Sequence, residues 1–248
     1  MSPAAATPAS AWSRISRTTP GPWAFWRFNW IINRLIAAAA ARTRRYAHGT
    51  LLDVGCGSMR ARPWYQDRIT RYLGIELPTS PYPLAQGIAA FARGEALPFR
   101  DGSIDTVVAV SMITCTPEPQ RVIDEAYRVL SPGGALIIEF TQMVPVHDEP
   151  HDYLRFTHYA ARWLLERAGF EMVECLPVGG LMTRVALSLM APLNRINRGP
   201  TRVLTELPVR LLYIVIQLGF ALLDRVWFDP KEVIANLVVA RRPAPGRA

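Results

Sequence analysis

The sequence predicts an α/β fold, a doubly wound seven-stranded sheet with covering helices and an apolar helical insertion before the last strand. Short apolar segments with strand character alternate with helical segments, which is typical of a parallel sheet. A turn with two glycines directly follows the first strand segment. Half of the 248 residues are hydrophobic, so the chain can bury one full core.

The chain begins with two different segments. Residues 1–20 are rich in alanine, serine, threonine and proline and lack the pattern of a secretory signal, so we expect a flexible tail. Residues 23–46 have helical periodicity with many aromatic side chains, and Gly49 ends the helix. We interpret these aromatic residues as packing on the following domain, with membrane contact as the less favoured alternative.

Strands and helices then alternate. Seven strands are predicted, at 50–54, 71–76, 88–91, 104–111, 135–140, 170–176 and 235–240. Residues 117–130 form an amphipathic helix, followed by a sharp turn at Ser131-Pro132-Gly133-Gly134. Thr157 is expected to cap a further helix that ends at Gly169.

The main domain consists of residues 21–177 and 231–241, and residues 178–230 form an insertion between these two parts. Residues 242–248 are a tail. The insertion contains apolar segments at 185–194 and 211–223. A membrane-spanning helix needs about 20 apolar residues, so neither segment is expected to cross a bilayer alone. The insertion fits a pair of helices lying in the membrane interface slightly better than a helical subdomain whose apolar faces are buried on a partner helix or in a dimer.

Charge and cysteine content indicate the compartment. The net charge of +8 comes almost entirely from arginine, since Lys231 is the only lysine. The arginines lie among apolar stretches, which suits the anionic inner face of a membrane better than a nucleic-acid groove. Cys56, Cys115 and Cys175 are isolated, as is typical of reduced thiols. We therefore expect a cytoplasmic protein, peripheral to the membrane, with no nucleic-acid partner.

The segment LLDVGCGSMR places Gly55 and Gly57 where a doubly wound sheet usually holds its ligand. Glu76 ends the second strand at the spacing at which a carboxylate accepts hydrogen bonds from ribose hydroxyls. Dinucleotide-binding turns have a third glycine beside the pyrophosphate, and Arg60 occupies that position here. The turn predicts a nucleoside ligand without a diphosphate, such as S-adenosylmethionine, and disfavours a dinucleotide oxidoreductase.

Four motifs, LLDVGCG, YLGIE, LPFRDGSIDTVVAV and RVLSPGGALIIEF, resemble those of class I S-adenosylmethionine-dependent methyltransferases of the type 11-like subgroup. The resemblance covers about residues 51–174 and implies a Rossmann-like sheet with 235–240 as a final antiparallel strand. It implies S-adenosyl-L-methionine as cofactor, with Gly55 and Gly57 against the methionine part, Asp53 beneath it and Glu76 on the ribose. It also implies that Glu95 and Ala96 flank the adenine and that Ser111 and Met112 border the methyl donor.

Two departures from the family pattern leave an alternative open. Arg93 stands where many relatives have an acid, and Thr114-Cys115 stands where many have Glu-His. A non-catalytic, membrane-associated binding protein on a methyltransferase fold is therefore the second hypothesis. The first is a methyltransferase that acts on a small acceptor, apolar or lipid-linked.

The segment HDEPHDYLRFTHY follows the fifth strand, where the acceptor should approach. His151 is the candidate catalytic base, because a histidine can accept a proton near neutral pH. His147, Tyr153 and Arg155 are candidate substrate contacts, while pairing of Asp152 with Arg155 simply to hold the loop is an equal alternative. A metal site is disfavoured, since Pro150 disrupts the helix that would align the two histidines. A similar P-H-D-Y-x-R-F-T segment occurs in a subgroup of the resembled family.

Overall fold

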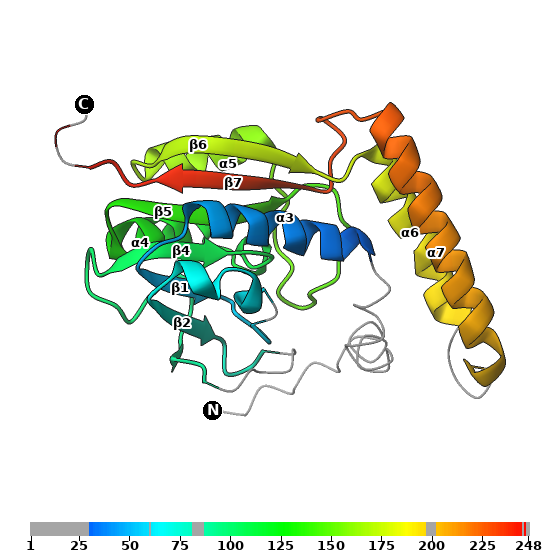
Figure 1. Cartoon of the computed structure of the whole chain (residues 1–248), viewed down its shortest axis with the longest axis horizontal. Helices are drawn as coiled ribbons and strands as arrows, with labels where there is room; N and C mark the ends of the chain where they lie inside the picture. The colour runs from blue at the N-terminus through cyan, green and yellow to red at the C-terminus, as the bar shows by residue number, and fades with distance from the viewer. Residues whose placement is uncertain (1–29, 60, 81–86, 197–201, 245, 247–248) are drawn as a thin grey trace, which may run out of the picture.

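The computed structural model describes residues 30–59, 61–80, 87–196, 202–244 and 246. A seven-stranded sheet runs through the molecule in the order β3-β2-β1-β4-β5-β7-β6 (Figure 1). Its strands are β1 (Thr50–Val54), β2 (Arg71–Glu76), β3 (Ala90–Phe91), β4 (Ile104–Ala109), β5 (Leu130–Thr141), β6 (Glu171–Val178) and β7 (Ala235–Arg241). Among the described strands, β7 runs antiparallel to its neighbours β5 and β6, and the other pairs are parallel. The predicted doubly wound sheet with a final antiparallel strand is confirmed.

Helices cover both faces of the sheet because successive strand residues point to opposite faces and are apolar on both. On β1, Leu51 and Leu52 are fully buried in two different cores. The Leu52 core is closed by α4 (Pro119–Val129) and α5 (His158–Arg167). The Leu51 core is closed by α3 (Trp30–Tyr46) and α6 (Leu181–Ile196). Strands buried on both faces are typical of parallel sheets.

No α-helix follows the glycine turn in the described residues, although a doubly wound sheet usually has one there. Two short 3₁₀ turns, Arg62–Trp64 and Gln66–Arg68, lead directly into β2. Pro63 lies in the first of them and has no backbone N–H to donate. The segment between β1 and β2, residues 55–70, forms only these short turns in its described part. The sheet is therefore less covered beside the turn than the sequence pattern suggested.

Other boundaries also differ from the sequence expectation. The third strand is reduced to Ala90–Phe91 at the sheet edge. The expected sharp turn at 131–134 is wrong, because β5 already begins at Leu130 and pairs there with Ile104 through a register shift. Gly134 allows this pairing, since a Cβ atom on it would lie 3.0 Å from the backbone oxygen of Asp105. The expected cap is confirmed, as Thr157 Oγ1 accepts a hydrogen bond from the Ala160 N–H at 3.2 Å.

Helices α6 and α7 (Arg202–Val226) form a hairpin beyond the carboxyl end of β6 (Figure 1). Helix α7 has 25 residues and extends well past the apolar segment 211–223. Its part Thr205–Val226 is long and apolar enough to cross a membrane by length and composition alone. The domain boundaries stay a prediction, and residues 1–20 and 23–29 lie outside the described part of the chain.

Candidate functional site

The glycine turn is tied to the end of β2. Gly55 and Gly57 have φ values of +75° and +48°, which side chains rarely adopt. The Gly55 N–H donates to the backbone oxygen of Ile75, and the Gly57 N–H donates to Glu76 Oε2 at 2.9 Å. The second oxygen of Glu76 accepts from the N–H of Leu77 at 2.8 Å. The turn and the Glu76 carboxylate therefore form one rigid unit at the carboxyl edge of the sheet.

Asp53 lies on the other side of the turn, on the face of β1 that α3 covers. The Tyr72 hydroxyl donates to Asp53 Oδ2 at 2.5 Å. Burial raises the pKa of Asp53 to about 6, and the nearby negative charge of Glu76 adds to the shift. An acid of this kind gains and loses its proton close to neutral pH.

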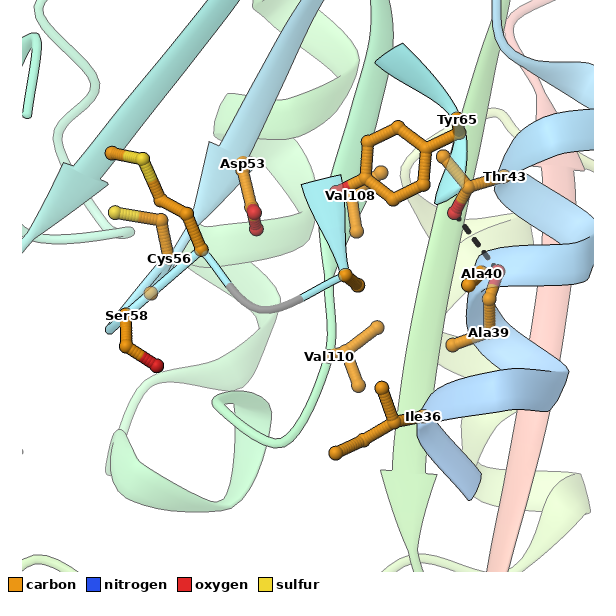
Figure 2. A pocket seen from close by; sticks show the side chains of 13 residues that line it. Ile36, Ala39, Ala40, Thr43, Asp53, Cys56, Ser58, Tyr65, Val108 and Val110 are labelled. Atoms are coloured by element: carbon orange, nitrogen blue, oxygen red, sulfur yellow. Dashed lines mark hydrogen bonds between the residues drawn. The ribbon is translucent and has the colours of Figure 1, made fainter. Parts of the chain in front are cut away.

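A cavity of about 140 Å³ opens beside Asp53 and the turn (Figure 2). Apolar side chains of α3 form one wall, the turn forms another, and Tyr65 lies at one end. Thr43 lines the same wall and donates its hydroxyl proton to the Ala39 oxygen. Apart from Asp53, the lining offers little charge: it is made by Ile36, Ala39, Ala40, Thr43, Asp53, Gly55, Cys56, Ser58, Met59, Ala61, Tyr65, Val108 and Val110.

The two carboxylates give the described part of the site a negative charge. Asp53 and Glu76 flank the turn, and their charges interact. Phosphate sites usually place a helix N-terminus behind such a turn, and here only 3₁₀ turns follow. Arg60 lies outside the described residues. The arrangement favours a ligand with positive charge and disfavours a pyrophosphate.

The end of β4 borders the same turn. Ser111 has a φ of +56°, and its backbone N–H donates to Glu139 Oε2 at 2.9 Å. Met112 follows it and lies against the turn, since a Cβ atom on Gly55 would be 3.0 Å from the Met112 Cβ. Met112 thus lies beside Gly55, and the role of Ser111 and Met112 in bordering the methyl donor stays a prediction.

The predicted adenine contacts lie in the turn after β3. Glu95 accepts a hydrogen bond from the Thr116 hydroxyl at 2.5 Å and pairs with Arg93 at 3.3 Å. The N–H of Ala96, which is exposed, donates to the backbone oxygen of Arg93. The Glu95 carboxylate therefore accepts hydrogen bonds from both Thr116 and Arg93. Its role and that of Ala96 in binding adenine stay predictions.

The acceptor loop, residues 142–157, is held together by Arg155. Its five N–H groups donate within this loop, to Asp152 and to the backbone oxygens of Val144, Pro145 and Leu154. The Asp152 side chain is 1% exposed and also accepts from the N–H of His147 at 2.9 Å. These contacts support the loop-holding alternative for Asp152 and Arg155, because Arg155 has no unused donor for a substrate.

The other predicted acceptor contacts lie on the exposed side of this loop. His151 Nδ1 is 3.0 Å from the Tyr153 hydroxyl, and the Tyr153 N–H donates to the Thr114 oxygen next to the end of β4. His147 is partly exposed and lies 3.3 Å from Asp148. Cys115 donates to Asp148, and burial raises the pKa of this thiol to about 12. The described residues hold no cluster of three metal ligands.

Sequence reasoning missed Glu139 and Tyr72. Glu139 is buried at the end of β5, where it accepts the N–H of Ser111. A single acid within the apolar segment ALIIEF was the available signal, since a buried acid needs partners. Tyr72 left no such signal, because a tyrosine in a strand is ordinary.

Comparison with known proteins adds a match in sequence. Residues 52–138 match the methyltransferase domain family. A protein of Mycobacteroides abscessus described as an uncharacterized methyltransferase is 31% identical over 135 residues, which are 48% of this chain and 51% of that protein. An arsenite methyltransferase of Halobacterium salinarum is 36% identical over 99 residues, 35% of this chain and 25% of that protein. The chain thus spans about half, or less, of the length of these relatives.

Solved structures are similar in fold. A possible histamine N-methyltransferase of Thermotoga maritima, described as S-adenosylmethionine-dependent, has a TM-score of 0.53 at 17% identity, with 93% of this chain and 98% of that chain covered. The (4+2)-cyclase SpnF has a TM-score of 0.55 at 20% identity, with 85% and 81% covered. The fold is that of class I S-adenosylmethionine-dependent methyltransferases, as the sequence motifs indicated. A cyclase among the neighbours means that fold alone does not identify the reaction.

Proposed function

We propose that this chain, which has a class I methyltransferase fold and a methyltransferase domain match at residues 52–138, transfers a methyl group from S-adenosylmethionine to a small acceptor. One observation carries the cofactor assignment: two carboxylates, Asp53 and Glu76, flank a glycine turn that is followed, in its described residues, by 3₁₀ turns and not by an α-helix. S-adenosylmethionine has a cationic sulfonium, an ammonium and ribose hydroxyls but no phosphate. The residues present therefore fit this cofactor.

Each residue would have a separate task. Glu76, already fixed by two backbone N–H groups, would accept the ribose hydroxyls. The cavity beside Asp53 would take the amino-acid end, with the carboxylate facing the ammonium group. Glu95 and Ala96 would lie beside the adenine, and Ser111 beside the methyl donor. The bound cofactor would supply an activated methyl group, so the protein needs chiefly to align the acceptor and exclude water.

His151 is the candidate base for an acceptor that must lose a proton. It lies on the acceptor loop next to Tyr153, whose backbone is tied to the end of β4. His147 and Tyr153 would contact the acceptor. Arg155 would act indirectly by keeping the loop in place, because its donors are used there. The acceptor would approach from this loop, since ligands of such sheets bind at the carboxyl ends of the strands.

An apolar or lipid-linked acceptor is the finer part of the proposal. Its support is the apolar hairpin α6–α7, which stands at the same edge of the sheet as the glycine turn (Figure 1). Arg184 of α6 contacts the sulfur of Met143, at the start of the acceptor loop. The three isolated cysteines, reduced in this proposal, suit a cytoplasmic location.

Calorimetry with S-adenosylmethionine tests the cofactor assignment. We expect the wild-type chain to bind, and Glu76→Ala to bind about thirtyfold more weakly because one charge-assisted hydrogen-bonding group is lost. Glu166→Ala, at an exposed position in the last turn of α5, is the matched control. No binding by the wild type, or equal binding by Glu76→Ala, would refute the assignment. Mass spectrometry of cell extracts incubated with labelled cofactor would then identify the acceptor.

A further inference from the structure

Helix α7 has an inverted distribution of polar and apolar side chains. Between Leu211 and Asp224 its polar side chains are Tyr213, Gln217 and Asp224, and all three turn toward the rest of the protein. Gln217 and Asp224 are only 2% and 6% exposed. A helix on the surface of a protein in water normally has its polar residues outside and its apolar residues inside.

The inward polar groups all have partners within the protein. The Tyr213 hydroxyl donates to the backbone oxygen of Met190 on α6. Gln217 accepts from the N–H of Ile31 at the start of α3. Asp224 accepts from backbone N–H groups at the start of α6, among them that of Gly180 at 3.0 Å. The orientation of α7 is therefore set by specific bonds, and its apolar face is held outward.

The outward face is a continuous apolar stripe. Its large side chains recur every three or four residues, the spacing of one helix face. Each is more than two-fifths exposed. The apolar stripe consists of Leu207, Leu211, Leu212, Val215, Leu218, Leu222 and Val226. The largest exposed apolar patch of a protein is often functional, so the apolar stripe is a candidate contact site for another apolar surface.

A lipid surface suits the apolar stripe better than a second copy of the chain. The stripe is about 30 Å long and about 10 Å wide, or roughly 300 Å², on the dimensions of a helix. A stable protein interface buries about 800 Å² on each partner, so the stripe alone is small for a dimer. An amphipathic helix can bind in the membrane interface without burying a minimum area of this kind.

Charge and aromatic residues identify the kind of lipid surface. Residues 181–205, which include α6, contain four arginines and no acid in sequence, and one of them, Arg184, pairs with Glu232 at 3.0 Å. Trp227 and Phe228 are exposed directly after the apolar stripe. Arginine attracts anionic lipid headgroups, and tryptophan prefers the membrane–water interface. A spanning orientation is disfavoured, because α6 is only 16 residues long and could not accompany α7 across.

We propose that the apolar stripe of α7 docks the protein on an anionic lipid surface, with the helix lying in the plane of the membrane interface. Docking would bring the carboxyl edge of the sheet close to the lipid, since the hairpin begins there (Figure 1). Lipid docking itself does not depend on methyl transfer. Only the delivery of an apolar acceptor from the membrane rests on the proposed function.

Co-sedimentation of the full chain with vesicles tests the docking. We expect the wild type to bind vesicles of equal parts phosphatidylglycerol and phosphatidylcholine, and to bind less to phosphatidylcholine alone. Placing carboxylates in the apolar stripe, by the double change Val215→Glu and Leu222→Glu, should weaken binding by about tenfold or more. Val173→Glu, at an exposed apolar position on β6 away from the hairpin, should bind like the wild type.

Several outcomes would overturn the proposal. They are absence of wild-type binding to the anionic vesicles, equal binding to both vesicle types, and unchanged binding by the double variant. A wild-type dimer in solution that the double variant converts to a monomer would assign the stripe to a second copy instead. If the double variant does not fold, the neutral change Leu218→Gln should still weaken binding, and unchanged binding would refute docking. Calorimetry with S-adenosylmethionine on the same samples reports separately on the proposed function.

Discussion

The backbone N–H of Ser111 donates a hydrogen bond to Oε2 of Glu139, a carboxylate that is 1% exposed. The other oxygen of Glu139 accepts from the Thr141 hydroxyl at 2.8 Å. Ser111 adopts a left-handed conformation at φ +56°, which a side chain adopts only at some cost in free energy. Glu139 therefore stabilises the bend at the end of β4 that brings Met112 against the glycine turn.

Replacing Glu139 by alanine should destabilise the protein by about 1–3 kcal/mol, because the partly buried N–H of Ser111 loses its charged acceptor. Glu139→Gln keeps one oxygen acceptor and should lose less. Urea unfolding monitored by circular dichroism measures both changes. Thr141→Val is the control for a general effect on packing. It removes the hydroxyl that donates to Glu139 and leaves the hydrogen bond between Ser111 and Glu139 in place. A free energy of unfolding for Glu139→Ala equal to that of the wild type would show that Ser111 does not need this contact.

Cofactor binding should depend on pH through Asp53. Its pKa is raised to about 6 by burial, so the carboxylate is largely protonated at pH 5 and largely ionised at pH 7. If the ionised form pairs with the cofactor ammonium, affinity should rise about tenfold between these pH values. Calorimetry at pH 5, 6 and 7 measures the rise. Asp53→Asn should bind weakly and with little pH dependence, whereas a wild-type affinity that stays constant would argue against the pairing.

The same raised pKa of Asp53 affects stability in a defined direction. A carboxyl whose folded pKa exceeds its unfolded value near 4 holds its proton more tightly in the folded state. Its contribution is therefore favourable below pH 4 and is lost as the pH rises through about 6. Asp53→Asn should accordingly raise the free energy of unfolding at pH 8 relative to that at pH 4. Parallel urea titrations at the two pH values, with the wild type as reference, measure the difference, and an equal difference in both proteins would contradict it.

Breaking the Asp152–Arg155 pair should loosen the acceptor loop. Hydrogen bonds from Arg155 lower the pKa of Asp152 to about 2, so this pair stabilises the fold above pH 4 and loses its effect as the pH falls through 2. Arg155→Lys cannot replace five donors in a fixed plane and should cost about 2 kcal/mol at pH 7. Hydrogen exchange of residues 142–157 and urea unfolding measure the change. The proposed loop-holding role predicts an effect on both, and a variant that lost only acceptor affinity would point to direct substrate contact.

The strand positions and the place of the glycine turn could be predicted because both follow from local patterns. Alternating apolar segments indicate the parallel sheet, and the spacing of Glu76 from Asp53 places two carboxylates at one edge. The sequence could not distinguish a substrate contact from a loop-holding role for Arg155. The loop-holding role depends on hydrogen bonds to three backbone oxygens of the loop, which no sequence motif indicates. The role of Glu139 also required the fold, because Ser111 lies 28 residues away in sequence.

The missing helix after the glycine turn was not predicted from the sequence. Pro63 lowers helix propensity at its position, but a proline in the first turn of a helix is tolerated. The chain between β1 and β2, residues 55–70, is long enough for a helix of about two turns. Neither feature accounts for the 3₁₀ turns, so only the structure shows that the described residues form no α-helix here.

Asp224 should hold the hairpin in its orientation. Its carboxylate accepts hydrogen bonds from the N–H groups of Gly180, Met182 and Thr183 and from the Thr183 hydroxyl, and so caps the start of α6 from the end of α7. Asp224→Ala leaves these donors buried without an acceptor and should cost about 1–3 kcal/mol, whereas Asp224→Asn, which keeps one oxygen, should lose less. Urea unfolding measures the stability, and limited proteolysis measures exposure of residues 202–226. Because the apolar stripe depends on this orientation, Asp224→Ala should also reduce vesicle binding. Increased cleavage without loss of vesicle binding would show that the stripe docks whatever the orientation of α7.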